Sequence, residues 1–176
     1  MQSIHKIGFG GGCHWCTEAV FQSLKGVTHV AQGFIAATEP ESSYSEAVIV
    51  SFNQDDLSLQ ELISVHLHTH NSTADHSLRT KYRSAVYVFD EHEISGVRNI
   101  LRSLQKDFVD PLITQVLLYT DFKASEEQFC NYYFSNPEKP FCETYIAPKL
   151  NKINLDFPDL FDQEMINTYP SSSPKF

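Results

Sequence analysis

The segment GGGCHWC, residues 10–16, separates a predicted strand from a predicted helix. The residues before it, 5–9, favour a strand, whereas residues 17–24 favour a helix that Gly26 would end. Three consecutive glycines let the backbone turn tightly, so Cys13 is expected where the helix begins. There its sulfur would face free backbone N–H groups and the positive end of the helix dipole, which favour the thiolate. The segment therefore predicts a redox-active nucleophile at Cys13 rather than a buried structural cysteine.

A second thiol, Cys16, follows one helical turn after the first. This spacing is typical of a redox disulfide of the thioredoxin kind, although Cys16 could equally be a packed core residue. Zinc is disfavoured, because Cys130 and Cys142 are separated by far more than the roughly two to four residues between paired zinc ligands. His66 and His70 are one helical turn apart but have no adjacent acidic or cysteine ligand, and they suit the end of a helix. We therefore predict no metal site.

Composition indicates a globular protein of one domain. The chain has 176 residues, 41% of them hydrophobic, and a net charge of −9, which disfavours nucleic acid and anionic membrane as partners. Four cysteines are too few for a secreted disulfide scaffold. No run of about 18 apolar residues predicts a membrane span, and the first residues lack the pattern of a signal peptide. We expect a cytoplasmic protein with a single catalytic domain, residues 1–160, and a C-terminal extension, 161–176, whose Pro- and Ser-rich end is frayed.

The rest of the chain alternates between short strands and helices. Ser58 and Glu61 form a predicted capping box, which opens a helix that extends to about residue 68. The order β-α-β-β-α-β followed by α-β predicts an α+β fold: a two-layer sandwich with a ferredoxin-like split β-α-β core and an added edge. The further elements expected are strands at 27–35, 46–52, 84–89 and 116–119, a helix with apolar residues at Val97, Ile100, Leu101, Leu104 and Phe108, and a helix at 125–134.

Two strands carry candidate partners for the nucleophile. Alternation places Glu46 on one face with Tyr44 and the apolar residues Val48 and Val50. An apolar environment favours the protonated carboxyl, which suits a general acid, whereas a glutamate exposed at a strand edge is the alternative. Tyr82 lies at the start of a later strand, where it either offers its hydroxyl to the site or packs against the core.

Together these residues resemble the peptide methionine sulfoxide reductase A family, whose signature is a Gly-Cys-Phe-Trp turn that opens a helix. The resemblance covers roughly residues 3–153. It implies a two-layer α+β fold and the reduction of methionine S-sulfoxide, free or in proteins, to methionine. The matching segments are Gly12-Cys13-His14-Trp15, Ser45-Glu46-Ala47-Val48, His70-Asn71-Ser72-Thr73, Tyr82-Arg83-Ser84 and Pro140-Phe141-Cys142.

The resemblance also implies roles for individual residues. Cys13 would attack the sulfoxide sulfur while Glu46 protonates the oxygen, which leaves a sulfenic acid on Cys13. Cys142 matches the distal recycling cysteine of the family and is the favoured resolving thiol, with Cys16 as the alternative. No bound cofactor is implied. Thioredoxin, or dithiothreitol in vitro, would reduce the resulting disulfide.

Four more residues would bind the substrate, and three features depart from the family pattern. Trp15 and His14 would line the pocket for the substrate methyl group, while Tyr82 and Tyr44 would donate hydroxyls toward the sulfoxide oxygen. His14 stands where the family usually has Phe, the loop at 38–44 is short, and Asp75 lies in a segment that replaces the family's Gly-Asn-Asp-x-Gly.

Two other functions remain open from the sequence. One is a thiol-disulfide oxidoreductase that uses Cys13 and Cys16 alone. The other is a protein that binds oxidised methionine without turning it over.

Overall fold

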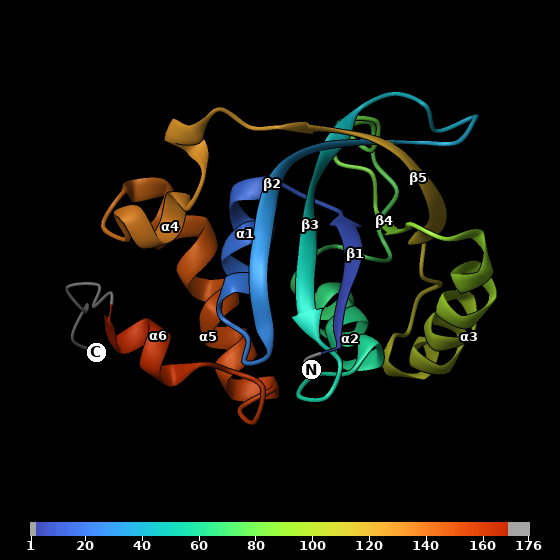
Figure 1. The fold of residues 1–176 in the computed structure, drawn as a ribbon. Helices are drawn as coiled ribbons and strands as arrows, with labels where there is room; N and C mark the ends of the chain where they lie inside the picture. Colours follow the sequence, from blue (N-terminus) through green and yellow to red (C-terminus); the bar gives the residue numbers. More distant parts are fainter. Residues whose placement is uncertain (1–2, 169–176) are drawn as a thin grey trace.

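A closed barrel of five strands forms the centre of the computed structural model, which describes residues 3–168 (Figure 1). The strands lie in the order β1-β3-β2-β5-β4, and β4 also pairs with β1. All neighbouring pairs are antiparallel except β4 with β5, which are parallel. Their bounds are β1 (Ile4–Gly10), β2 (Val27–Ala37), β3 (Ser45–Asn53), β4 (Ala85–Val88) and β5 (Gln115–Ala124).

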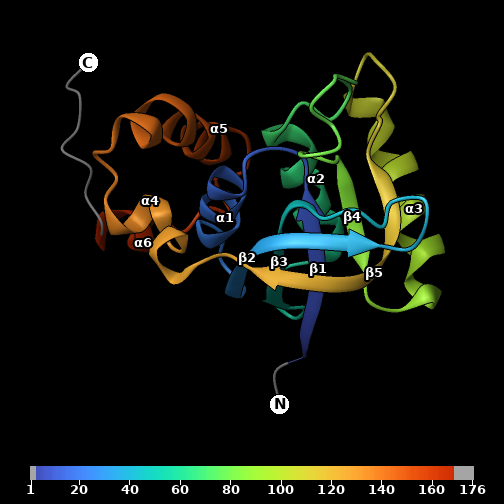
Figure 2. The same ribbon diagram turned by 90° about the horizontal axis from the view of Figure 1, so that it is seen from above.

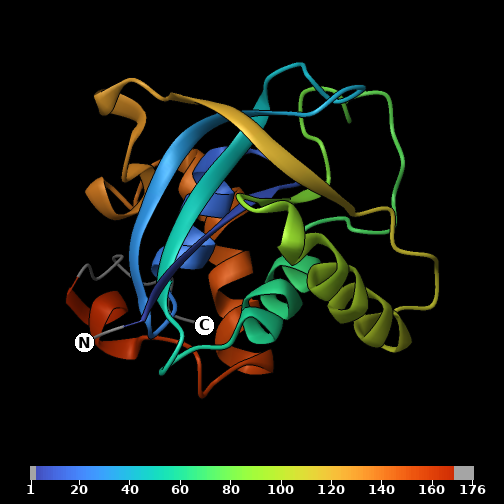
Figure 3. The same cartoon turned by 45° about the vertical axis from the view of Figure 1, so that its right-hand side comes forward.

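Helices cover the outside of the barrel on two sides. Helices α1 (His14–Gln22), α4 (Tyr132–Ser135), α5 (Ala147–Asp156) and α6 (Gln163–Thr168) gather on one side, and α3 (Ile94–Leu104) lies on the opposite side (Figure 2). Helix α2 (Leu59–Thr69) packs beside both α3 and α5 (Figure 3). The predicted capping box at Ser58 and Glu61 is present, and it satisfies free backbone N–H groups at the start of α2.

The larger core lies between the barrel and these helices, not inside the barrel. Alternating residues of β3 show why: Val48, Val50 and Phe52 face the helices, whereas Ala47 faces the small barrel interior with Tyr87. Phe21 of α1 is fully buried and stacks on Phe9 of β1 with ring centroids 4.5 Å apart. Because Glu46 shares the parity of Val48, its side chain lies on the helix-facing side of β3.

The predicted α+β class is confirmed, but the ferredoxin-like sandwich with an added edge is not. Strand β5 pairs with β2 at Gly33 and Ala124, and with β4 at Ala85 and Gln115. It therefore joins both margins of the sheet and removes the edge that the sequence predicts. Strand order alone does not reveal this closure, because it depends on how far β5 bends over the barrel.

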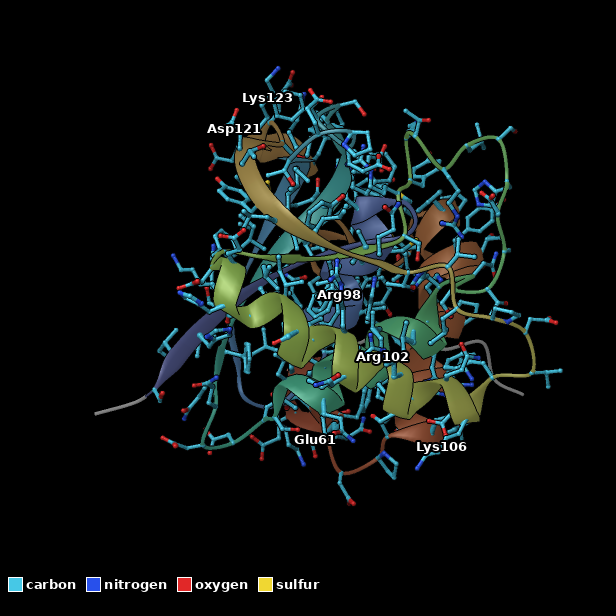
Figure 4. The ribbon with its side chains drawn as sticks, turned by 90° about the vertical axis from the view of Figure 1, so that its right-hand side faces the viewer. Glu61, Arg98, Arg102, Lys106, Asp121 and Lys123 are labelled. Carbon is cyan, nitrogen blue, oxygen red and sulfur yellow. The ribbon has the colours of Figure 1, made fainter. Side chains whose placement is uncertain are left out.

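The helix predicted at 125–134 is largely wrong. Residues Glu127–Phe129 form a single 3₁₀ turn, and Asn131 adopts a left-handed conformation with φ 54° before α4 begins. The left-handed residue stops the chain from continuing as one helix. By contrast, α3 follows its apolar spacing: Val97, Leu101 and Leu104 are buried, although Phe108 falls beyond the helix end. Its exposed face carries Arg98 and Arg102, and Lys106 is exposed in the 3₁₀ turn Gln105–Asp107 that follows the helix (Figure 4).

The C-terminal part of the described chain packs against the barrel side that carries α1. Phe161 is buried and pairs with Leu24, and the Asp162 N–H donates to the Ser23 carbonyl at 2.7 Å. The predicted domain boundary at residue 160 stays a prediction, and the predicted frayed end at 169–176 lies outside the described residues. Within residues 3–168, every helix is too short or too polar to cross a bilayer.

Candidate active site

Cys13 lies at the junction of β1 and α1, as the glycine segment predicts. It is the residue before the first turn of α1, and its carbonyl accepts the Cys16 and Thr17 N–H groups, each at 3.1 Å. The glycines serve close packing: a side chain on Gly11 would collide with the ring of His70. Only glycines at this point let the turn approach the end of α2 so closely.

The electrostatic environment favours the thiolate of Cys13. Its pKa is lowered, chiefly because the Cys16 thiol donates a hydrogen bond to its sulfur and because the Trp15 and Cys16 N–H groups do the same. Partial burial and the nearby Glu46 carboxylate oppose this effect. The hydrogen bond and burial raise the pKa of Cys16. The hydrogen bond therefore favours the thiolate at Cys13 and the protonated thiol at Cys16.

Cys142 lies in the same buried cluster as Cys16. It is fully buried in the π-helical turn Cys142–Ile146, and its pKa is raised by burial. The Cys16 thiol also interacts electrostatically with Cys142. All four cysteines are free thiols. The structure thus places Cys16 beside the nucleophile and Cys142 in the same buried cluster as Cys16.

Glu46 reaches the same junction from β3. Its side chain is almost buried, and its Oε2 accepts the His14 N–H at 3.0 Å, which ties the carboxyl to the start of α1. The Lys81 Nζ lies 3.7 Å from Oε1 and is largely exposed. The Glu46 carboxyl is therefore held at the start of α1 and is largely shielded from bulk solvent.

Aromatic rings form a wall beside the nucleophile. Trp15 stacks on Tyr132 with centroids 4.1 Å apart and meets Phe141 edge-on at 5.3 Å. Trp15 and His14 line a hollow of about 400 Å³ together with Phe34, Lys123, Glu126 and Phe129. Such a hollow can accept an apolar group beside Trp15.

The two predicted tyrosines have different positions. Tyr82 is half-buried at the margin of the site, where Lys81 lies over its ring with Nζ 4.9 Å from the centroid. Tyr44 is exposed, and its hydroxyl donates to Asp121 of β5 while Lys123 lies over its ring. The structure therefore brings Tyr82 near Glu46 through Lys81, whereas the Tyr44 hydroxyl is engaged by β5.

Sequence reasoning missed a basic group behind the thiols. Lys149 of α5 lines a cavity of about 50 Å³ with Cys13, Cys16, His66 and His70, and its ammonium donates to the Thr69 carbonyl. Burial lowers the pKa of His70 to about 4 and that of His66 well below its ordinary value, so both rings are neutral. The sequence places Lys149 on the C-terminal side of Cys142, but only the packing of α5 on α1 brings it to the site.

A second missed residue supports the glycine turn. Arg79 donates to the Gly11 carbonyl at 3.0 Å and to the Tyr82 carbonyl at 2.9 Å. Asp75, in the segment that departs from the family pattern, is exposed and interacts with Arg79. The guanidinium thus holds the loop before β4 against the turn that carries the nucleophile.

A helix-end thiolate, a second thiol and a buried carboxyl on a closed α+β barrel define a cysteine-dependent oxidoreductase. The family model for peptide methionine sulfoxide reductase matches residues 5–159. This chain belongs to that family, which confirms the resemblance seen in the sequence and the predicted enzyme class.

Individual relatives agree with this assignment. The peptide methionine sulfoxide reductase MsrA of Acinetobacter baumannii is 31% identical over 166 residues, which cover 86% of this chain and 95% of that protein. Reduced Mxr1 from Saccharomyces cerevisiae has a TM-score of 0.69 at 21% identity, covering 81% of this chain and 91% of that one. Mxr1 in complex with Trx2 has a TM-score of 0.58 at 18% identity, covering 72% and 84%. The two solved structures share the fold.

The sulfur-to-sulfur hydrogen bond makes a testable prediction about alkylation. Iodoacetamide should modify Cys13 with a pH midpoint below the ordinary thiol value of 9.0, and Cys16→Ala should raise that midpoint because the main hydrogen-bond donor is lost. Rates are read by mass spectrometry of fragmented tryptic peptides, which separates the two sites. Cys130→Ser serves as the control and should leave the midpoint in place. An unchanged midpoint in Cys16→Ala would show that this bond does not set the thiolate.

Proposed function

We propose that this chain reduces methionine S-sulfoxide, free or in proteins, with Cys13 as the nucleophile and Glu46 as the proton donor. The observation that carries the proposal is the meeting of a helix-end thiolate with a nearly buried carboxyl, because a simple disulfide exchange needs no such acid. Membership of the peptide methionine sulfoxide reductase family supports the substrate class. Selectivity for the S epimer rests on the resemblance, since separate enzyme classes reduce the two epimers.

The chemical step balances with one proton. The Cys13 thiolate attacks the sulfoxide sulfur, Glu46 gives a proton to the sulfoxide oxygen, and the substrate S–O bond breaks. The oxygen ends on Cys13 as a sulfenic acid, while methionine leaves with its sulfur reduced by two electrons. The Trp15 wall and its hollow would hold the substrate methyl group, and Tyr82 would donate a hydroxyl toward the oxygen.

We infer that Cys16 resolves the sulfenic acid first, ahead of the predicted Cys142. Cys16 hydrogen-bonds to the Cys13 thiolate, and its pKa is raised by that bond, by burial and by the Cys13 charge. Oxidation of Cys13 removes the bond to the thiolate and its charge, which leaves burial to raise the pKa of Cys16 and the Lys149 ammonium to lower it. Condensation then releases water and forms a Cys13–Cys16 disulfide. Cys142 would receive the disulfide from Cys16 by exchange.

Thioredoxin is the proposed reductant, with dithiothreitol as its substitute in vitro. The complex of the structurally similar Mxr1 with Trx2 supports this partner. Recycling of this kind suits a reducing compartment such as the cytoplasm. No bound cofactor is proposed, because the cysteines supply both electrons. The sequence leaves two other functions open: disulfide reduction by Cys13 and Cys16 alone, and binding of oxidised methionine without turnover. The next experiment distinguishes both of them from sulfoxide reduction.

Substitution of the two central residues distinguishes these functions. Cys13→Ser should abolish the release of methionine from a methionyl S-sulfoxide, and Glu46→Gln should slow it by about 10²–10⁴-fold in single turnovers at neutral pH. Glu143→Gln, at an exposed position, should retain the wild-type rate. Insulin disulfide reduction should be indifferent to Glu46→Gln. Turnover by Cys13→Ser would exclude the proposed function, and binding of the sulfoxide without release by the wild type would favour the non-catalytic alternative.

The order of resolution can be read from the first disulfide. One equivalent of S-sulfoxide without reductant should give a Cys13–Cys16 bridge in peptide maps of rapidly quenched samples. Cys16→Ser should accumulate a Cys13 sulfenic acid that dimedone traps, because the contacting thiol is missing. A Cys13–Cys142 bridge as the first product in the wild type would instead assign resolution to Cys142.

A further inference from the structure

His14 is buried against the acid of the site with both ring nitrogens directed at polar groups. Its Nδ1 lies 2.8 Å from the Gly33 carbonyl oxygen, and its Nε2 lies 3.8 Å from Oε2 of Glu46. Phe34 meets the ring edge-on with centroids 5.0 Å apart. These contacts fix the plane of the imidazole between β2 and β3.

The contact with Gly33 determines which nitrogen can exchange a proton. A carbonyl oxygen only accepts hydrogen bonds, so Nδ1 carries the hydrogen. In the neutral ring, Nε2 therefore presents a lone pair toward Glu46, and in the charged ring it presents an N–H. The Gly33 carbonyl is held in the barrel because Gly33 pairs with Ala47 of β3 and Ala124 of β5. The barrel thus sets the tautomer of His14.

The Glu46 carboxyl contacts both the backbone and the ring of His14. Its Oε2 accepts the His14 backbone N–H at 3.0 Å and also faces the ring Nε2 at 3.8 Å. The longer distance closes with a small rotation of the Glu46 carboxyl toward the ring, and catalytic contacts are often longer before substrate binds. A proton can therefore pass between Nε2 and Oε2.

Charged groups of both signs surround the Glu46 carboxyl. The His14 backbone N–H donates to it, and the Lys81 ammonium lies 3.7 Å from Oε1. The negative charge of Glu46 in turn opposes the Cys13 thiolate. Around the ring, Glu18 of α1 interacts with His14 from the next helical turn, and Lys123 and Glu126 line the adjoining hollow. Among these groups, imidazole is the side chain that gains and loses a proton near neutral pH.

We propose that His14 is a positioning residue that stores, on Nε2, the proton that Glu46 delivers to the sulfoxide oxygen. This inference rests on the proposed function. In each turnover the proton moves from Nε2 to Oε2 and then to the oxygen, which leaves the ring neutral. The ring regains a proton from solvent by way of the hollow that it lines. The family pattern has Phe at this position, and Phe cannot hold a proton. The proposed proton store is therefore a feature of this chain and not of the family pattern.

The pH dependence of single turnovers tests the proposal. In His14→Gln the alkaline limb of the rate of methionine formation should move to lower pH, with a loss of about tenfold near pH 8 and a near wild-type rate near pH 5.5. His14→Phe, which fills the same space with the family's residue, should show the same shift. His29→Gln, an exposed histidine of β2, is the matched control and should leave the profile in place.

The outcomes separate this inference from the proposed function. An active His14→Gln protein with an unmoved alkaline limb would overturn the inference and leave the function standing. A change confined to KM at every pH would give His14 a role in substrate binding only, which also overturns it. No methionine from the wild type at any pH would overturn the function itself.

A spectroscopic measurement that keeps His14 in place covers the case in which the His14 variants fail to fold. Nitrogen-15 NMR of labelled histidines should show Nε2 of His14 titrating while Nδ1 keeps its hydrogen. Glu46→Gln should shift that titration to lower pH, because the ring loses the partner that stabilises its charge. An identical titration in Glu46→Gln would show that the two groups do not share a proton.

Discussion

The proposed chemistry of this protein depends on the position of one sulfur atom, that of Cys13 at the start of α1, and the barrel determines that position. Strand β1 pairs with β3 on one side and β4 on the other, so the point at which it ends is fixed. Stacking of Phe21 on Phe9 fixes α1 against the same strand. Because both flanking elements are held, the glycine turn places Cys13 where the N–H groups of α1 and the Cys16 thiol converge on its sulfur. This geometry favours the thiolate of Cys13.

The Glu46 carboxylate and the Cys13 thiolate would repel each other, and other charged and polar groups of the site contact both residues. The Glu46 charge opposes the Cys13 thiolate, while the Lys81 ammonium and the His14 N–H contact the Glu46 carboxyl. In the proposed mechanism the His14 imidazole supplies a proton to this carboxyl without adding a permanent charge. Lys149 lines the small cavity beside Cys13 and Cys16, where its charge lowers the pKa of Cys16. The proposed acid step and the proposed disulfide step thus involve different groups around Cys13.

Local signals in the sequence predict the parts of the site that neighbouring residues build. Three features depend on short-range spacing, and the structure has each of them: the glycine turn, the capping box at Ser58, and the position of Glu46 on the same face of β3 as Val48. Closure of the barrel by β5 depends on pairing between segments far apart in the chain, which spacing does not encode. The same reason hides Arg79, Lys149 and the aromatic partners of Trp15. Tyr44 is a predicted donor whose hydroxyl instead bonds to Asp121. Asp121 belongs to β5, which is longer than the strand that the sequence predicts at 116–119.

The central claim is that Cys13 takes the oxygen from one epimer of methionine sulfoxide. Its most direct test offers the fully reduced protein, without added reductant, the separate S and R epimers of a methionyl sulfoxide and counts the methionine released per protein chain. The account predicts release from the S epimer alone, matched by an equal loss of free thiol pairs, and continued turnover once dithiothreitol or thioredoxin is added. No release from the S epimer, or equal release from both epimers, would contradict it.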